Sequence, residues 1–116
     1  MTMTKLSHTK NPPLESNYQK SVKERIIREF PGARVAKAEP SRFWQGVPDL
    51  LITYKGIITW FECKRETNAA KRRNQEWWVR KLNEETFACF CYPEVKEEAF
   101  CKLHEFYDTH QIKENA

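Results

Sequence analysis

Apolar residues recur along this chain with two different periods, and the changes of period predict the order of its elements. Over residues 14–30 they recur at every fourth position, which predicts an amphipathic helix that stops at Pro31. A weaker alternation over residues 33–39 predicts a strand. The same signals then predict strands at 50–54 and 57–63, a helix from 68 or 71 to 82, a strand at 86–92 and a helix at 93–108.

The two central strands are joined by Lys55-Gly56, which predicts a β-hairpin because Gly supplies the positive φ angle of a tight turn. Asp49 opens the first strand, and Glu62 and Lys64 close the second, so antiparallel pairing brings all three to one end of the sheet. Alternation along the strand puts Glu62 and Lys64 on the same face. Two acids and a lysine gathered there predict a site for one hard cation.

The element order predicts an α/β or α+β fold, in which helices flank a mixed sheet of about four strands. A chain of 116 residues is expected to form one domain, here over residues 14–108. The polar segment 1–13 is expected to be flexible, and 109–116 to be a tail. No stretch has the pattern of a membrane span or a signal peptide, so no membrane partner and a cytoplasmic location are expected.

Charge favours a polyanionic partner only mildly, because 20 Lys and Arg against 16 Asp and Glu give a formal net charge of +4. Before the hairpin, Arg42 could bind phosphate and Trp44 could stack on a base, although Trp44 could equally cap the core. After the hairpin, cations gather that would form either a rim following a phosphate backbone or an ordinary solvated surface: Lys64, Arg65, Lys71, Arg72 and Arg73.

Three acids of the first predicted helix compete for a place beside this site. Glu15 and Glu29 lie within the apolar face centred on Val22, whereas Glu24 points away from it. We therefore prefer Glu15, then Glu29, and place Glu24 last. A carboxylate in the first turn of a helix is also stabilised by the helix dipole, so Glu15 could serve the helix alone.

These residues carry a family resemblance. Pro48-Asp49, followed after a strand by Glu62-Cys63-Lys64, resembles the Pro-Asp…(Asp/Glu)-x-Lys signature of the PD-(D/E)XK nuclease superfamily. The wider runs Gly-Val-Pro-Asp-Leu and Phe-Glu-Cys-Lys-Arg-Glu, with a later Gln, resemble its virus-type replication-repair nuclease branch, VRR-NUC. The likeness covers most of the chain and implies a restriction-endonuclease-like core.

The resemblance implies a metal-dependent endonuclease that hydrolyses phosphodiester bonds in DNA. Lys64 would orient the attacking water or help to deprotonate it. Mg²⁺ is the implied cofactor, with Mn²⁺ as a substitute, and the implied ligands are Asp49, Glu62, the backbone carbonyl of Cys63 and, directly or through water, Glu15.

The VRR-NUC pattern also begins its first helix with a Glu that is followed four residues later by a Gln, as Glu15 and Gln19 are here. It places a further Gln at the start of the helix after the hairpin, which Gln75 matches. By this resemblance Gln75 helps to order the site. A core amide with satisfied hydrogen bonds is the alternative reading of Gln75.

Stand-alone VRR-NUC proteins, often encoded by phages, resemble Holliday-junction resolvases and act as homodimers. On this resemblance alone we expect a branched DNA substrate, a homodimer and, for a phage protein, the host-cell cytoplasm. The chain has more aromatic residues than its predicted core requires, and these are candidates for a self-complementary patch: Phe43, Trp44, Trp77 and Tyr107.

Other readings stay open at this point. The chain could be a nucleic-acid-binding module without catalysis, or a nicking or sequence-specific nuclease of the same fold. Four residues also have spacings that could hold zinc, although free thiols or plain core positions account for the cysteines equally well: Cys89, Cys91, Cys101 and His104.

Overall fold

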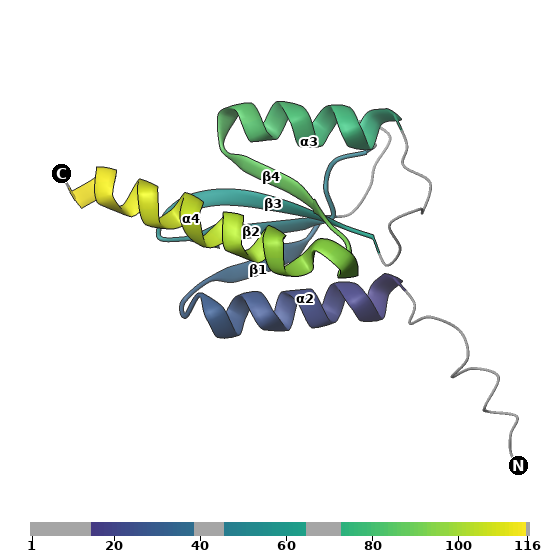
Figure 1. The fold of residues 1–116 in the computed structure, drawn as a ribbon, viewed down its shortest axis with the longest axis horizontal. Helices are drawn as coiled ribbons and strands as arrows, with labels where there is room; N and C mark the ends of the chain where they lie inside the picture. The colour runs from purple at the N-terminus through teal and green to yellow at the C-terminus, as the bar shows by residue number, and fades with distance from the viewer. Residues whose placement is uncertain (1–14, 39–45, 65–72, 116) are drawn as a thin grey trace, which may run out of the picture.

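The computed structural model describes residues 15–38, 46–64 and 73–115, which form three α-helices around a four-stranded sheet (Figure 1). In chain order the elements are α2 (Glu15–Glu29), β1 (Arg34–Lys37), β2 (Leu50–Tyr54), β3 (Ile57–Cys63), α3 (Arg73–Glu85), β4 (Phe87–Cys91), the 3-10 turn η1 (Pro93–Val95) and α4 (Lys96–Asn115).

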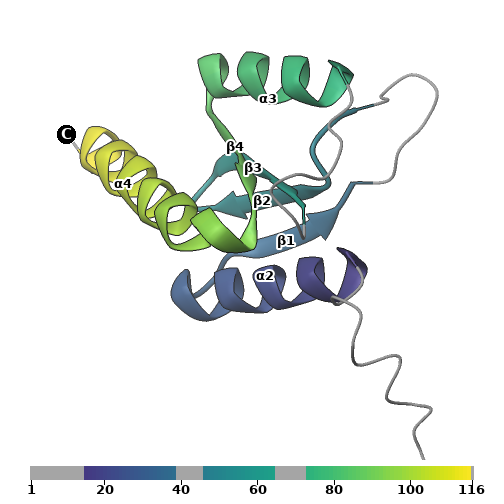
Figure 2. The same cartoon turned by 45° about the vertical axis from the view of Figure 1, so that its right-hand side comes forward.

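The sheet is mixed, with strand order β1-β2-β3-β4. β1 and β3 both pair antiparallel with β2, whereas β3 and β4 are parallel. Helices α2 and α4 cover one face and α3 covers the other (Figures 1 and 2). This arrangement confirms the predicted α/β class with helices on both sides of about four strands.

The central hairpin has the bounds that the sequence predicted. Lys55 and Gly56 have φ angles of 52° and 81°, and two successive positive φ angles match a type I′ turn. The twist of such a turn suits two antiparallel strands, so Leu50 pairs with Phe61 and Tyr54 with Ile57. The register therefore carries Asp49 to the same end of the sheet as Glu62.

The hydrophobic core lies between the sheet and the α2–α4 layer. The predicted fourfold stripe of α2 faces it, and α4 adds a second stripe. Burial of each such side chain stabilises the fold by about 1.5–3 kcal/mol. The core residues of this layer are Tyr18, Val22 and Ile26 from α2, Phe30 directly after it, and Ala99, Phe100, Leu103 and Tyr107 from α4.

Tyr107 belongs to this core, so its predicted place in an exposed dimer patch is wrong. Only 1% of the residue is exposed. Its hydroxyl donates to the backbone carbonyl of Ile57 at 3.0 Å, so its lone pairs can accept the 2.9 Å hydrogen bond from the Thr59 hydroxyl. Burial raises the pKa of Tyr107 to about 12.

Glu29 fastens α2 to α4 and is not available to a site near Asp49. Its carboxylate accepts hydrogen bonds from Arg25 at 2.6 Å and from His104 at 2.9 Å. Arg25 also binds Glu97 through two 2.7 Å hydrogen bonds. Burial alone would raise the pKa of Glu29, but the bonds from His104 and Arg25 outweigh it and hold that pKa below its ordinary value.

The last helix is longer than the sequence predicted. α4 continues to Asn115, so residues 109–115, which we expected to form a tail, are helical. The apolar stripe ends near Tyr107 and gives no signal beyond it. Within the described ranges, no helix combines the length and the apolar character that a membrane crossing requires.

Two neighbouring isoleucines of α2 test this account of the core. Ile26 is 0% exposed, whereas Ile27 is 45% exposed. We predict that Ile26→Ala lowers the free energy of unfolding by about 2–5 kcal/mol, because it removes buried apolar surface and leaves a cavity. Ile27→Ala should change that free energy by no more than about 0.5 kcal/mol. Urea unfolding of both variants would measure this, and equal losses would contradict the orientation of α2.

Candidate active site

Two acidic residues are held side by side by main-chain hydrogen bonds where β2 begins and β3 ends. The backbone N–H of Asp49 donates to Oε1 of Glu62 at 3.2 Å, and the backbone N–H of Cys63 donates to Oδ1 of Asp49 at 3.0 Å. Each acid therefore accepts a main-chain hydrogen bond from the strand of the other. Because both donors belong to the hairpin, its register holds the two carboxylates side by side.

The remaining oxygen of each carboxylate accepts a side-chain amide. Gln19 of α2 donates to Oδ2 of Asp49, and Gln75 of α3 donates to Oε2 of Glu62 at 3.0 Å. The two helices lie on opposite faces of the sheet and begin at the same end of it (Figure 2). Neutral donors thus approach the acid pair from both sides without cancelling its negative charge.

Lys64 is enclosed together with Glu62. Nζ of Lys64 lies 3.7 Å from Oε2 of Glu62, and the two residues are 7% and 3% exposed. The backbone N–H of Lys64 donates to the carbonyl of Cys91 at 3.3 Å, and Tyr18 donates to the same carbonyl at 3.1 Å. These bonds fix the main chain of Lys64 between β4 and α2, so its amine is held beside the acid pair.

Gly46 lets α3 come close to this end of the sheet. Its φ angle is 88°, a left-handed value that glycine adopts without strain. A Cβ at this position would lie only 2.5 Å from Cβ of Asn74, and Asn74 is followed at once by Gln75. The missing side chain of Gly46 therefore allows the first turn of α3 to reach the position from which Gln75 contacts Glu62.

The donor set suits a hard divalent cation. Carboxylate oxygens are the ligands that Mg²⁺ and Mn²⁺ prefer, and here two carboxylates lie at the adjoining ends of β2 and β3. A carboxylate oxygen has two lone pairs, so an oxygen that accepts a hydrogen bond can also coordinate a metal. Among the described side chains, Asp49 and Glu62 are a pair, and no group of three or more His, Cys, Asp or Glu forms a metal cluster.

The structure places the other predicted site residues only in part. Glu15 opens α2 and Arg73 opens α3, but the positions of their side chains lie outside the described part. Glu24 is exposed on α2, as predicted. The remaining predicted DNA contacts lie outside the described residues: Arg42, Trp44, Arg65, Lys71 and Arg72.

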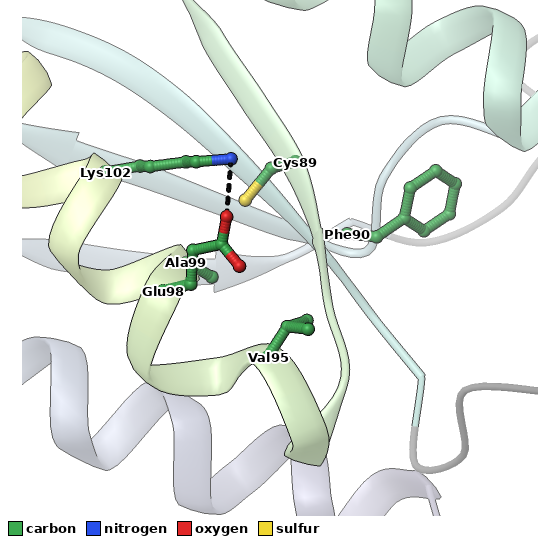
Figure 3. A pocket seen from close by; sticks show the side chains of 6 residues that line it. All are labelled: Cys89, Phe90, Val95, Glu98, Ala99 and Lys102. Atoms are coloured by element: carbon green, nitrogen blue, oxygen red, sulfur yellow. Dashed lines mark ion pairs between the residues drawn. The ribbon is translucent and has the colours of Figure 1, made fainter.

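The four residues considered for zinc do not gather. Cys89 lines a pocket of about 120 Å³ between β4 and α4, where it lies beside the ion pair of Glu98 and Lys102 (Figure 3). Cys101 is exposed on α4, and its thiol contacts Glu105. His104 instead binds Glu29.

Burial also disfavours the thiolate that zinc requires. It raises the pKa of Cys89 to about 12 and that of Cys91 to about 11. The Cys91 thiol lies 3.6 Å from the hydroxyl of Tyr18, inside the core. The zinc hypothesis for these residues therefore has no geometric support in the described structure.

Gln19 is the site contact that the sequence signalled least. The VRR-NUC pattern distinguishes it only as the Gln four residues after Glu15 and predicts no contact for it. Its bond to Asp49 depends on how α2 packs under the sheet, which no local pattern predicts. Gln75, by contrast, was named by the resemblance as a residue of the site, and its amide contacts Glu62.

A Pro-Asp and a Glu-x-Lys at the adjoining ends of two hairpin strands, in a mixed sheet between helices, define the PD-(D/E)XK nuclease class. Among solved structures, the chain is similar to one described as a VRR_NUC domain, with 26% sequence identity and a TM-score of 0.59. The match covers 80% of this chain and 96% of the other. This chain therefore has the fold of the VRR-NUC family, which confirms the resemblance and implies a nuclease.

Comparison of sequences alone does not find this likeness. No family model matches the chain, and no curated protein matches it. The likeness is thus carried by the arrangement of the elements together with the short motifs at the end of the sheet.

Gly46 and Gly56 provide a matched test of how α3 is positioned. Both have positive φ angles, 88° and 81°, but a Cβ on Gly56 would meet no atom within 4 Å. We predict that Gly56→Ala costs roughly 1–2 kcal/mol through backbone strain alone. Gly46→Ala should cost more, because its methyl group also displaces the first turn of α3.

Urea unfolding measures the two costs, and hydrogen exchange locates the effect. The amides of the first turns of α3 should exchange faster in Gly46→Ala than in Gly56→Ala. If both variants lose the same stability and α3 exchanges alike in both, the contact between Gly46 and α3 does not position the helix.

Proposed function

We propose that this protein is a metal-dependent endonuclease that hydrolyses phosphodiester bonds in DNA. The observation that carries the proposal is the pair Asp49 and Glu62, held by two backbone N–H groups and two glutamine amides beside the enclosed amine of Lys64. A hairpin does not need such a cluster for its stability. The VRR-NUC-like fold gives the same cluster a nuclease context.

Mg²⁺ is the proposed cofactor, and Mn²⁺ should replace it. Asp49 and Glu62 would hold the ion through their carboxylate oxygens. The backbone N–H of Cys63 points toward Asp49, and in a strand the carbonyl of a residue points to the same side as its N–H, so this carbonyl is suited to be a third ligand. Glu15 is a further proposed ligand on the resemblance alone, directly or through water.

When bound, such an ion polarises the phosphate and stabilises the negative charge that develops on the leaving oxygen. Lys64 would donate a hydrogen bond from Nζ to the attacking water and orient its lone pair toward phosphorus. The water oxygen would form the new bond to phosphorus and release its proton to solvent. The bond from phosphorus to the 3′ oxygen would break, and that oxygen would take a proton from solvent, which leaves a 5′-phosphate and a 3′-hydroxyl.

Gln19 and Gln75 would act by orienting the two carboxylates. Each amide occupies one lone pair of one carboxylate oxygen and so fixes the direction of the rest. Each contact also ties a helix to the site. The carboxylates are therefore held in position before substrate arrives, as efficient metal catalysis requires.

The finer proposal is a structure-selective enzyme that acts on branched DNA as a homodimer. Two symmetric cuts in a four-way junction need two copies of a site, and a two-fold dimer supplies them. This step rests on the likeness to stand-alone VRR-NUC proteins. Of the aromatic residues considered for the interface, Trp77 is 43% exposed and remains a candidate.

Cleavage assays test the function directly. Purified protein should cut supercoiled plasmid and a four-way junction with Mg²⁺ and leave both intact with a chelator. Asp49→Asn and Glu62→Gln should each reduce cleavage to background and abolish Mn²⁺ binding by calorimetry, because a neutral amide is a far poorer ligand for a hard cation.

Three outcomes separate the alternatives. Paired cuts in the junction by a dimer, measured by light scattering, support the resolvase proposal, whereas a monomer that only nicks plasmid would remove that proposal and keep the nuclease. DNA binding without any cleavage would reduce the protein to a nucleic-acid-binding module.

Lys64→Met tests the role of the amine. Methionine keeps most of the buried aliphatic volume and removes the charge. We predict a fall in cleavage rate of about 100-fold or more, as for the loss of one positioned hydrogen-bond donor at a reacting centre. Mn²⁺ binding should persist, since Asp49 and Glu62 remain, and circular dichroism should confirm the fold. A variant that cuts at the parent rate would show that Lys64 has no part in the chemistry.

A further inference from the structure

Three lysines gather beside the acid pair on the side of α2 and β1. Lys20 immediately follows Gln19, which contacts Asp49, and Lys23 lies about one turn further along the helix. At about 100° per residue the two lysines share one flank of α2. Arg25 leaves the opposite flank toward α4, where it binds Glu97, so the lysine flank faces away from α4.

Lys37 reaches the same region from the sheet. It pairs with Leu50, and the next residue, Ala38, donates its backbone N–H to the carbonyl of Asp49 at 2.8 Å. Val35 packs against the core, and side chains two residues apart share a face of a strand, so Lys37 points to the α2 side of the sheet. The end of β1 thus brings a third amine toward the flank of α2.

These amines reach solvent, and the described side chains do not neutralise them. Lys20 and Lys37 are exposed and Lys23 is partly exposed. In the described part of the chain, none of the three forms an ion pair, whereas Lys81 and Lys102 pair with Glu84 and Glu98.

Glu24 is the exposed acid nearest to this flank in the sequence. It follows Lys20 by four residues, and with the lysine first this is the weaker orientation of an i,i+4 pair. Among the described side chains, this flank therefore carries more positive than negative charge.

We propose that Lys20, Lys23 and Lys37 bind the phosphate backbone of DNA beside the scissile phosphate, on the α2–β1 side of the site. The inference rests on the proposed function and extends it. The basic rim predicted from Lys64 to Arg73 lies between β3 and the start of α3 in the sequence, whereas these lysines belong to α2 and β1, so they are proposed as a separate contact. Lysine contacts to phosphate carry little sequence information, so this surface holds and orients DNA whatever its sequence.

Salt dependence of binding tests the proposal. Lys20→Gln, Lys23→Gln and Lys37→Gln are combined in one variant, and Lys55→Gln, Lys81→Gln and Lys102→Gln, all exposed, in a control with the same change of charge. Binding to a labelled duplex and to a four-way junction is measured by fluorescence anisotropy in chelator over a range of salt. Thermal unfolding checks that both variants fold.

Each lost phosphate contact lowers the slope of log K against log salt by about 0.9, so the test variant should lose about 2.7. The control should keep the parent slope, because its charges lie elsewhere. In cleavage with Mg²⁺, the test variant should raise KM and keep kcat. A test variant whose slope and affinity equal those of the control would overturn the proposal.

Glu24→Lys provides a change in the opposite direction. An added cation on the same helix should steepen the salt slope, and an unchanged slope would count against this surface.

If the parent binds DNA but does not cut it, the nuclease proposal fails while the slopes still decide the role of the lysines. If the parent cuts DNA and the test variant keeps its slope, only the lysine surface fails.

Discussion

The two hydrogen bonds that join the start of β2 to the end of β3, from the backbone N–H of Asp49 to Glu62 and from that of Cys63 to Asp49, are the constraint on which the rest of this structure depends. Two carboxylates this close repel each other, and the repulsion is strong where water is partly excluded. The backbone N–H of Asp49 and that of Cys63 offset the repulsion by donating across the hairpin. These two hydrogen bonds form in the observed register because it brings each backbone N–H beside the carboxylate that accepts it. The Lys55-Gly56 turn favours the same register of β2 and β3.

The helices complete this arrangement from opposite faces of the sheet. α2 is placed by its buried stripe, and its first turns deliver Gln19 to Asp49. α3 is placed by the close approach that Gly46 permits, and it delivers Gln75 to Glu62. Packing of the core therefore fixes the positions of the two carboxylates at the end of the sheet. A carboxylate that is free to move would bind a metal poorly.

Much of this could be predicted from the sequence, because the strongest signals are local. Alternation and a Lys-Gly turn gave the hairpin its bounds, and the order of Asp49, Glu62 and Lys64 gave the site its acids and its amine. The predictions that failed concern residues whose roles depend on tertiary contacts. Glu29, the second choice for the helix acid, and Tyr107, a candidate for the dimer patch, have other roles because their partners, His104 of α4 and Thr59 of β3, lie far away in the sequence.

Other features carried no local signal at all. The burial of Lys64 beside Glu62 follows from the packing of β3, β4 and α3, not from the acid-x-lysine spacing. Gly46 could be read as a turn residue, but its contact with the first turn of α3 could not. The polar end of α4 has no apolar stripe, so its helical state was missed.

The central claim is that Asp49 and Glu62 together bind one hard cation at the end of the sheet. Crystals of the protein soaked with Mn²⁺, with anomalous diffraction collected to locate the ion, test this most directly. We expect one strong peak within coordination distance of a carboxylate oxygen of each acid and of the carbonyl of Cys63. At saturating Mn²⁺, no peak between the two acids, or a peak bound by only one of them, would contradict the account.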